Sequence, residues 1–301
     1  MATHRARRRH LAFAGGLAAL ALTLGFTASP ATAAPPPPIT YVALGDSYTA
    51  GTGAGDLSRP PLVACWQSSP GYVDDVAATG RVALVANLAC HGAVLFPAGP
   101  FYDGVTPSVF EQITSSVGQS ALHNAGLVSI TAGAVDAGSL LALQNCSTQD
   151  TQLCEGTVSG IIANLPVIES GLEIIYQNIR ASAPEATLTV MGYPRLFDPA
   201  NGLPVIPPAN QVQVNLAVDA LNATIAKAVA DSQTNAKFID VTKKFLGHAA
   251  NSADPWLVMI LAPVPPFDRL PDANFHPNEA GHLAYAAALL SAIKPAQLAK
   301  R

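Results

Sequence analysis

The stretch YVALGDSY, residues 41–48, decides the fold of this chain. Its first four residues form an apolar run that stops at Gly45 and is followed at once by Asp46 and Ser47. Such a run predicts a buried β-strand that ends in a tight turn. Because a serine hydroxyl is a weak nucleophile by itself, Ser47 is a candidate nucleophile only if a base and hydrogen-bond donors lie nearby.

Four more apolar stretches predict buried strands, and helical stretches separate them. We expect strands at residues 81–89, 127–131, 186–191 and 237–241, and helices at residues 70–79, 109–119, 158–182, 210–232 and 277–293. Strands that alternate with helices predict an α/β fold, a three-layer α/β/α sandwich around a central five-stranded parallel sheet. One domain should cover residues 39–301, and Pro166 should break the third helix.

A base for Ser47 is available near the end of the chain. His276 precedes the last predicted helix, and Asp268 and Asp272 precede His276. Sites in such folds form outside the carboxyl ends of the strands, where glycine turns follow the first four strands. The predicted catalytic set is therefore Ser47, His276 and Asp272, since geometry and not sequence order decides a triad. The alternative is a turn serine and a helix-capping loop without chemistry.

The first 33 residues predict a secretory signal peptide. Four arginines among residues 5–9 precede an apolar run at residues 11–24, and residues 31–33 read ATA, an A-x-A cleavage site. Residues 34–38 form a proline-rich leader. The alternative, a membrane anchor, is disfavoured because the apolar run is short and no stop-transfer pattern follows. We expect a secreted, extracellular protein, exported by the Sec or the twin-arginine route.

The charge of the mature chain limits its partners. The signal holds four arginines and no acidic residue, so 12 basic and 20 acidic residues remain, a formal charge of −8. This charge argues against binding to nucleic acid or to an anionic membrane surface. No apolar stretch after the signal is long enough to span a bilayer. No histidine or cysteine spacing indicates a metal site, so we expect no metal and no cofactor. We also expect a monomer.

The four cysteines predict disulfide bonds. Their number is even and the chain is expected to be exported, which favours disulfides over a metal site or a reactive thiol. Cys146 and Cys154 would close a short loop between two predicted helices, and Cys65 and Cys90 would close a longer one. Free buried thiols are the alternative.

Two motifs at opposite ends of the mature chain resemble one family. GDSY at residues 45–48 and HPN at residues 276–278 are similar to motifs of the SGNH, or GDSL, hydrolases. NLAC at residues 87–90, GYPR at residues 192–195 and the cysteine spacing resemble secreted actinobacterial lipases and esterases. The resemblance implies the SGNH hydrolase fold, with Ser47 as nucleophile and His276 as general base. It also implies an oxyanion hole formed by the backbone N–H groups of Ser47 and Gly92.

The third block departs from the family pattern. The family usually has G-x-N-D there, whereas residues 133–136 read GAVD. The family asparagine is the third oxyanion donor, and Val135 cannot donate a hydrogen bond. Losing one such donor typically costs about 10² to 10³ in turnover. The candidates for a replacement donor are Asn87, Asn274 and His91.

The position of the acid also departs from the pattern. The family spacing D-x-x-H would place an aspartate at position 273, where this chain has Ala273, and the nearest aspartate is Asp272. A backbone carbonyl of the same loop is the alternative, because the group that orients the imidazole need only accept a hydrogen bond from its ring N–H.

The expected function is a serine ester hydrolase. We expect a lipase or esterase that cleaves carboxylic esters of acyl lipids or small esters through an acyl-enzyme on Ser47, at a rate reduced by Val135. The alternatives are an impaired protein of the same fold that binds a lipid or cell-wall ligand, and a carbohydrate deacetylase. Phe96, Phe101, Tyr102 and Phe110 are candidates for an acyl groove, or else for loop packing.

Overall fold

The first strand lies in the middle of a parallel sheet. The computed structural model describes residues 37–266 and 268–298. β1 (Ile39–Gly45) pairs with β2 (Val82–Asn87) on one side and with β3 (Leu127–Thr131) on the other. β4 (Thr187–Met191) and β5 (Lys237–Ile239) continue the sheet beyond β3. The strand order is β2-β1-β3-β4-β5 and all pairings are parallel, so the predicted five-stranded sheet is confirmed.

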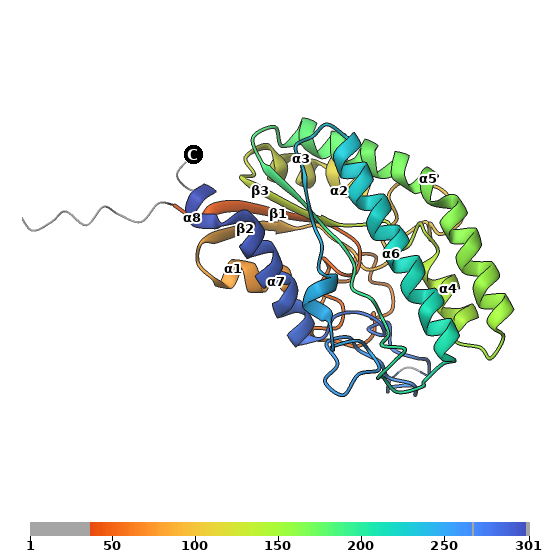
Figure 1. Cartoon of the computed structure of the whole chain (residues 1–301). Coiled ribbons are helices and arrows are strands. Elements are labelled where there is room, and N and C mark those ends of the chain that lie inside the picture. Colours follow the sequence, from red (N-terminus) through yellow and green to blue (C-terminus); the bar gives the residue numbers. More distant parts are fainter. Residues whose placement is uncertain (1–36, 267, 299–301) are drawn as a thin grey trace, which may run out of the picture. The chain divides into compact units, whose positions relative to one another are not determined.

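Helices cover both faces of this sheet (Figure 1). One face carries α1 (Tyr72–Ala78) and α7 (Glu279–Ile293); the other carries α2 (Val109–Thr114), α3 (Ser116–His123), α5 (Thr151–Ser182) and α6 (Pro208–Asp231). The shorter elements are α4 (Ser139–Cys146), which packs against α5 and α6, the 3-10 helix η1 (Thr242–Phe245) and α8 (Pro295–Leu298). The three-layer α/β/α architecture is therefore confirmed.

Burial on both faces explains the composition of the central strands. Residues Tyr41 to Leu44 of β1 are completely buried, and every residue of β3 is buried. A strand covered by helices on both sides requires apolar residues at consecutive positions rather than at alternate ones. This is why residues 41–44 lack the alternation of apolar and polar residues that is typical of a strand with one face in water.

The end of β1 requires glycine. Gly45 has φ +126°, and a Cβ atom built on it would lie 2.1 Å from the carbonyl oxygen of Thr131 in β3. Gln112 of α2 accepts a hydrogen bond from the Gly45 N–H at 2.8 Å and donates one to its carbonyl oxygen at 2.9 Å. The turn that presents Ser47 is therefore held by β3 on one side and by α2 on the other.

Two helix predictions are wrong. Helix α5 continues through Pro166, although proline removes one hydrogen bond of the helix. Leu165 and Ile168, on both sides of the proline, are buried in the core and keep the two halves in line. The predicted helix 109–119 is instead divided into α2 and α3, because the side chain of Ser115 accepts a hydrogen bond from the N–H of Gly118 at 3.0 Å and caps a new helix.

The expectation that no later stretch is long enough to span a bilayer is corrected: among the described helices, α5 is long and apolar enough to cross a membrane by length and composition. Several of its largest apolar side chains are buried in the hydrophobic core, among them Leu172, Ile175 and Ile179. We interpret α5 as a core helix, since this buried face belongs to the hydrophobic core and the helix packs against α6, α4 and α2.

The cysteines are paired as Cys65–Cys90 and Cys146–Cys154. The first bond joins two loops near the carboxyl end of β2, and the second joins the last residue of α4 to the first turn of α5. The described part of the chain contains no free cysteine.

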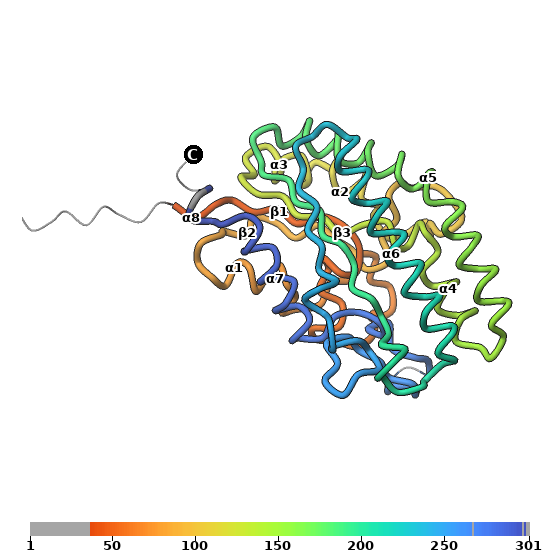
Figure 2. Tube along the Cα trace, viewed as in Figure 1, coloured from red at the N-terminus to blue at the C-terminus, as the bar shows by residue number. Residues whose placement is uncertain are grey.

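The described chain forms a compact unit that begins at Pro37, and early and late segments of this unit lie side by side. The predicted signal peptide, residues 1–33, and residues 34–36 of the leader lie outside the described residues. Figure 2 shows the blue helix α7 beside the orange helix α1. In the loop before α7, the N–H of Ala273 donates to the carbonyl oxygen of Leu57 at 2.9 Å. The late histidine loop is thereby joined to the loop that follows β1.

Candidate active site

The predicted site residues gather at the carboxyl ends of the strands. Ser47 follows β1, Gly92 follows β2, and Val135 follows β3, while His276 arrives from the loop before α7. This is the edge of a parallel sheet where sites are expected. The sheet order places β1 between β2 and β3, so Ser47 is central among the three turns.

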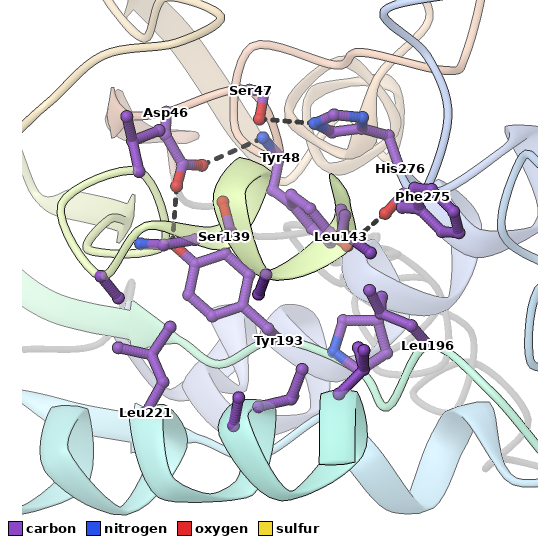
Figure 3. A pocket seen from close by; sticks show the side chains of 18 of the residues that line it. Asp46, Ser47, Tyr48, Ser139, Leu143, Tyr193, Leu196, Leu221, Phe275 and His276 are labelled. Atoms are coloured by element: carbon purple, nitrogen blue, oxygen red, sulfur yellow. Dashed lines mark hydrogen bonds between the residues drawn. The ribbon is translucent and has the colours of Figure 1, made fainter. Parts of the chain in front are cut away.

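Ser47 and His276 are hydrogen-bonded. The Nε2 atom of His276 lies 2.6 Å from the Oγ atom of Ser47 (Figure 3). Two backbone hydrogen bonds hold the histidine loop: the N–H of Phe275 donates to the carbonyl oxygen of Val258, and the N–H of Val258 donates to that of His276, each at 2.8 Å. Ser47 is 7% exposed and His276 is partly exposed, so the hydroxyl is largely shielded from bulk water while the ring borders the open side of the site.

A backbone carbonyl orients the histidine ring. The Nδ1 atom of His276 lies 2.9 Å from the carbonyl oxygen of Asn274. A carbonyl oxygen can only accept, so we assign the proton to Nδ1, which leaves the lone pair of Nε2 directed at the hydroxyl of Ser47. This is the arrangement that a general base for serine requires.

Asp272 is therefore not the group that orients His276, and this prediction is corrected. Its carboxylate instead accepts a hydrogen bond from the backbone N–H of Arg59 at 2.8 Å and is ion-paired with Arg269. The family position belongs to Ala273, which is completely buried. A shift of one residue along this turn directs the aspartate outward, and the Asn274 carbonyl takes its place.

Burial keeps His276 neutral. Its pKa is lowered from 6.5 to about 4, mainly because desolvation disfavours the imidazolium, although backbone carbonyls of the same loop oppose the shift. A neutral imidazole accepts a proton, so the shift preserves the basic form into the acid range.

Two backbone N–H groups are available for an oxyanion. Within residues 37–266 and 268–298, neither the Ser47 N–H nor the Gly92 N–H donates to a protein acceptor. Gly92 has φ +82°, which glycine adopts without strain. Unpaired backbone donors beside a nucleophile can stabilise the oxyanion of a tetrahedral intermediate.

The replacement donors that the sequence suggested are mostly engaged elsewhere. The side-chain amide of Asn87 donates to the carbonyl oxygen of Thr49 at 3.3 Å, and that of Asn274 donates to the carbonyl oxygen of Ile260 at 2.8 Å. The Nδ1 atom of His91 lies 3.1 Å from Oγ1 of Thr52, and the His91 and His276 ring centroids are 5.5 Å apart. Val135 itself lines the pocket of Ser47 with an apolar side chain, which offers no donor.

Sequence reasoning missed two tyrosines that join the site together (Figure 3). The hydroxyl of Tyr48 donates to the carbonyl oxygen of Phe275 at 2.6 Å. Phe275 has φ +64°, a conformation that is costly for a bulky residue and that is held by its surroundings. Tyr193 donates to the carboxylate of Asp46 at 2.6 Å and accepts from the N–H of Ala134. The signal in the sequence that could have identified these two residues is that Tyr48 lies in the GDSY motif and Tyr193 in the GYPR motif.

An apolar pocket begins at Ser47 and His276. Its polar members include Asp46 and Ser139, and its other walls are mostly apolar side chains of α4, α5, α6 and the loop after β4: Ala142, Leu143, Ile161, Pro194, Leu196, Val214, Ala217, Val218 and Leu221. In Figure 3 Leu143, Leu196 and Leu221 surround the space beyond Tyr193. Such a pocket accommodates an aliphatic chain next to a nucleophile.

The aromatic residues that were candidates for an acyl groove or for packing do not line this pocket, so the pocket gives no support to the groove. Among the described residues, Phe96 and Phe110 contact each other with centroids 5.7 Å apart and pack on the core. Phe101 lies beside Gly138 at the start of α4. Packing, the alternative, describes Phe96 and Phe110, although Phe110 belongs to α2 and not to a loop.

The sequence is similar to known lipases. The profile of the GDSL-like lipase/acylhydrolase family matches residues 43–284. A lipase of Streptomyces rimosus is 31% identical over 259 residues, covering 85% of this chain and 87% of that lipase. Lipase 1 of Streptomyces coelicolor is 30% identical over 219 residues, covering 72% of this chain and 75% of its own.

Solved structures agree with the sequence match. The extracellular lipase of Streptomyces rimosus superposes with a TM-score of 0.69 at 28% identity, and phospholipase A1 of Streptomyces albidoflavus with a TM-score of 0.69 at 29% identity. Each comparison covers 84% of this chain and 99% of the other. The family match spans well over half of the chain and includes both Ser47 and His276. The chain is therefore an ester hydrolase that belongs to the GDSL-like lipase/acylhydrolase family.

Proposed function

We propose that this protein is a secreted serine esterase or lipase that cleaves carboxylic esters through an acyl-enzyme on Ser47. The observation that carries the proposal is the contact of 2.6 Å between the Ser47 hydroxyl and Nε2 of His276 at the entrance of an apolar pocket. A nucleophile, a neutral base and a place for an acyl chain then lie together.

The proposed reaction uses a dyad. Ser47 Oγ attacks the ester carbonyl while His276 Nε2 takes its proton, and the N–H groups of Ser47 and Gly92 stabilise the oxyanion. His276 then returns this proton to the leaving alcohol, which leaves an ester between the acyl group and Ser47. Water, deprotonated by the same imidazole, attacks that ester; the bond between the acyl carbon and Ser47 Oγ breaks, His276 returns the proton to Oγ, and the carboxylic acid is released. The Asn274 carbonyl keeps the ring oriented throughout.

The substrate is proposed to carry an aliphatic acyl group. The walls supplied by α4, α5 and α6 are apolar, and burial of each methylene group contributes about 0.8 kcal/mol. The relatives named lipase and phospholipase A1 support an acyl lipid or a small ester as the substrate class. We propose that Val135, which offers no third donor, lowers the rate of the acylation step.

Secretion is proposed from three independent features. The N-terminal pattern of residues 1–33 is that of a signal peptide, the four cysteines are paired, and a similar Streptomyces lipase is extracellular. The Sec and twin-arginine routes both fit the basic region. N-terminal sequencing of protein recovered from culture medium tests the proposal, which predicts a mature chain that begins after Ala33.

The experiment that tests the function is labelling with a fluorophosphonate probe together with hydrolysis of p-nitrophenyl octanoate. We expect one probe adduct per molecule, located on Ser47 by peptide mass spectrometry, and release of p-nitrophenol. A protein of this fold that only binds a lipid or cell-wall ligand would remain unlabelled. That outcome would overturn the proposal.

The pH dependence should reveal the buried base. Because the pKa of His276 is lowered to about 4, the imidazole remains neutral and basic well below the ordinary histidine value of 6.5. We expect kcat/KM to fall to half on the acid side near pH 4, measured in a discontinuous assay with circular dichroism as the control for folding. An acid limb centred at pH 6.5 with the fold intact would contradict the assignment.

Tyr48→Phe should lower kcat without a matching change in KM. The substitution removes the hydrogen bond to the Phe275 carbonyl, which holds the strained residue next to His276, and leaves the ring contacts in place. We expect kcat to fall by about tenfold and KM to change by less than about twofold, since a small misplacement of a base is costly. Steady-state kinetics on p-nitrophenyl octanoate measure both constants.

Tyr176→Phe is the matched control for this tyrosine. Tyr176 is completely buried in α5, and within the described part of the chain its hydroxyl has no hydrogen-bond partner. Removing that hydroxyl should leave kcat unchanged and stability unchanged or slightly higher. Equal losses of activity in the two variants would show a general packing effect instead of positioning by Tyr48.

A further inference from the structure

A second cavity, of about 520 Å³, lies next to the proposed catalytic pair. Residues 59–63, His91, Asp103, Val105, Arg269 and Asp272 line it. Helices α4, α5 and α6 contribute nothing to these walls, so this cavity is distinct from the apolar pocket.

His91 connects this cavity to the reacting atoms. Its ring centroid lies 5.5 Å from that of His276, and the next residue in the chain is Gly92, a proposed oxyanion donor. An ester bound at Ser47 has an acyl part and an alcohol part on opposite sides of its carbonyl carbon. If the acyl part occupies the apolar pocket, the alcohol part would extend to the opposite side of the carbonyl carbon, and His91, which lines the second cavity, is 5.5 Å from the ring of His276 by ring centroids.

The charges of this cavity are paired and fixed. Arg59 lies 3.8 Å from Asp103, and Arg269 is ion-paired with Asp272. Arg59 also donates to the carbonyl oxygens of Val63 at 2.6 Å and Ala64 at 2.8 Å. The side chains of Asp103 and Arg269 are about half exposed to solvent, with 46% and 47% accessible. The cavity is thus neutral in sum but presents charged acceptors and donors in fixed places.

Both carboxylates remain ionised at neutral pH. Burial disfavours their charged forms, but N–H groups of Thr106 and Val105 hold the pKa of Asp103 below its ordinary value. Arg269 and the Arg59 N–H do the same for the pKa of Asp272. An anionic group, such as a phosphate, would meet both carboxylates as well as the two guanidinium groups, so the cavity offers it no net electrostatic attraction.

We propose that this cavity is a subsite for the alcohol part of the ester and that it selects an uncharged polyol, such as glycerol or a sugar. The inference rests on the proposed ester hydrolysis at Ser47. Hydroxyl groups both donate to carboxylates and accept from guanidinium groups, so a polyol matches Asp103, Asp272 and Arg269. Pro60, Pro61 and Val105 provide apolar surface for its carbon atoms. A plain alkyl alcohol would cover these charged groups without replacing their hydration.

The first test compares esters that share one acyl group. The full chain is assayed on ethyl octanoate, 1-monooctanoylglycerol, methyl 6-O-octanoylglucoside and 1-octanoylglycerol 3-phosphate. We expect kcat/KM for at least one of the two polyol esters to exceed that for the ethyl ester by about fivefold or more, the gain from one or two hydrogen bonds. The glycerol and glucose esters distinguish the two sources of polyol. Equal values for ethyl and polyol esters, or a preference for the phosphate ester, would overturn the proposal.

The second test narrows the cavity. Val105 is 61% exposed at its rim, so Val105→Trp fills space without disturbing the core. We expect the polyol-to-ethyl ratio of kcat/KM to fall to about 1, because the lost hydrogen bonds supplied the preference. Val117→Trp is the matched control: Val117 is 62% exposed on α3, lines neither cavity and should keep the wild-type ratio. An unchanged ratio in Val105→Trp would refute the subsite.

The two proposals fail in different ways. If none of the four esters is hydrolysed and Ser47 is not labelled by the probe, the proposed function fails. If ethyl octanoate is hydrolysed and Ser47 is labelled but no polyol preference is found, the function stands and only the subsite is wrong.

Discussion

Ser47→Ala should abolish ester hydrolysis, with a fall in kcat of about 10⁴-fold or more. The hydroxyl is the atom that forms the acyl-enzyme in the proposed reaction, and His276 cannot replace it because its Nε2 atom is placed to accept a proton from that hydroxyl. What remains after its removal is binding and the oxyanion donors, which give only residual catalysis. The measurement is single-turnover kinetics on p-nitrophenyl octanoate.

The fold should survive this substitution, which makes the result interpretable. Alanine fits the space of the serine side chain, and the backbone of the turn is held by Gly45, Gln112 and Thr131. Ser139 provides the control because it lines the same pocket. Ser139→Ala should still form the fluorophosphonate adduct, whereas Ser47→Ala should not. Retained hydrolysis in Ser47→Ala would exclude Ser47 as the nucleophile.

Val135→Asn should raise kcat by about 10²-fold or more. An oxyanion donor is worth about 10² to 10³ in turnover, and the resemblance of GAVD to the family pattern G-x-N-D implies the family asparagine at this position. Val135 is partly exposed in the pocket of Ser47, so an amide at this position is not forced into the core. The turn itself should persist, since it is held by backbone bonds such as that from the Gly138 N–H to the Val135 carbonyl at 2.9 Å.

Val135→Ala separates the new donor from a change in volume. It shortens the side chain without adding a donor, so it should leave kcat far below that of Val135→Asn. Equal rates in the two variants would mean that another group already serves the oxyanion. His91 would then be the first residue to test, because Asn87 and Asn274 are committed to backbone partners.

Local patterns predicted much of the site. A nucleophile turn must interrupt a buried strand, and glycine at its end is required by contact with the neighbouring strand, so residues 41–48 carried both the strand and Ser47. His276 was recognisable because the loop before the last helix is the natural return point to the carboxyl edge of the sheet. The pairing of Cys146 with Cys154 followed from their short separation.

The errors share one physical origin. A proline removes a single hydrogen bond, but the decision to continue α5 belonged to buried side chains on both sides of it. Asp272 and Ala273 differ by one position in a turn, and which of them faces His276 depends on the path of the loop against Val258 and Arg59. The pocket walls came from α4 to α6, segments in which the sequence offered no catalytic signal.

By itself, the sequence predicted the five strands in their order along the chain, and Ser47 and His276 as the proposed nucleophile and base, because hydrophobic period and turn chemistry are local properties of the chain. Tertiary structure alone decided that the Asn274 carbonyl, and not Asp272, orients His276, and that Tyr48 and Tyr193 join the site together. It also placed Val135 in the apolar pocket of Ser47 and a neutral, charge-paired cavity beside His91. These features are contacts between residues far apart in the chain, and such contacts depend on how the packed layers meet.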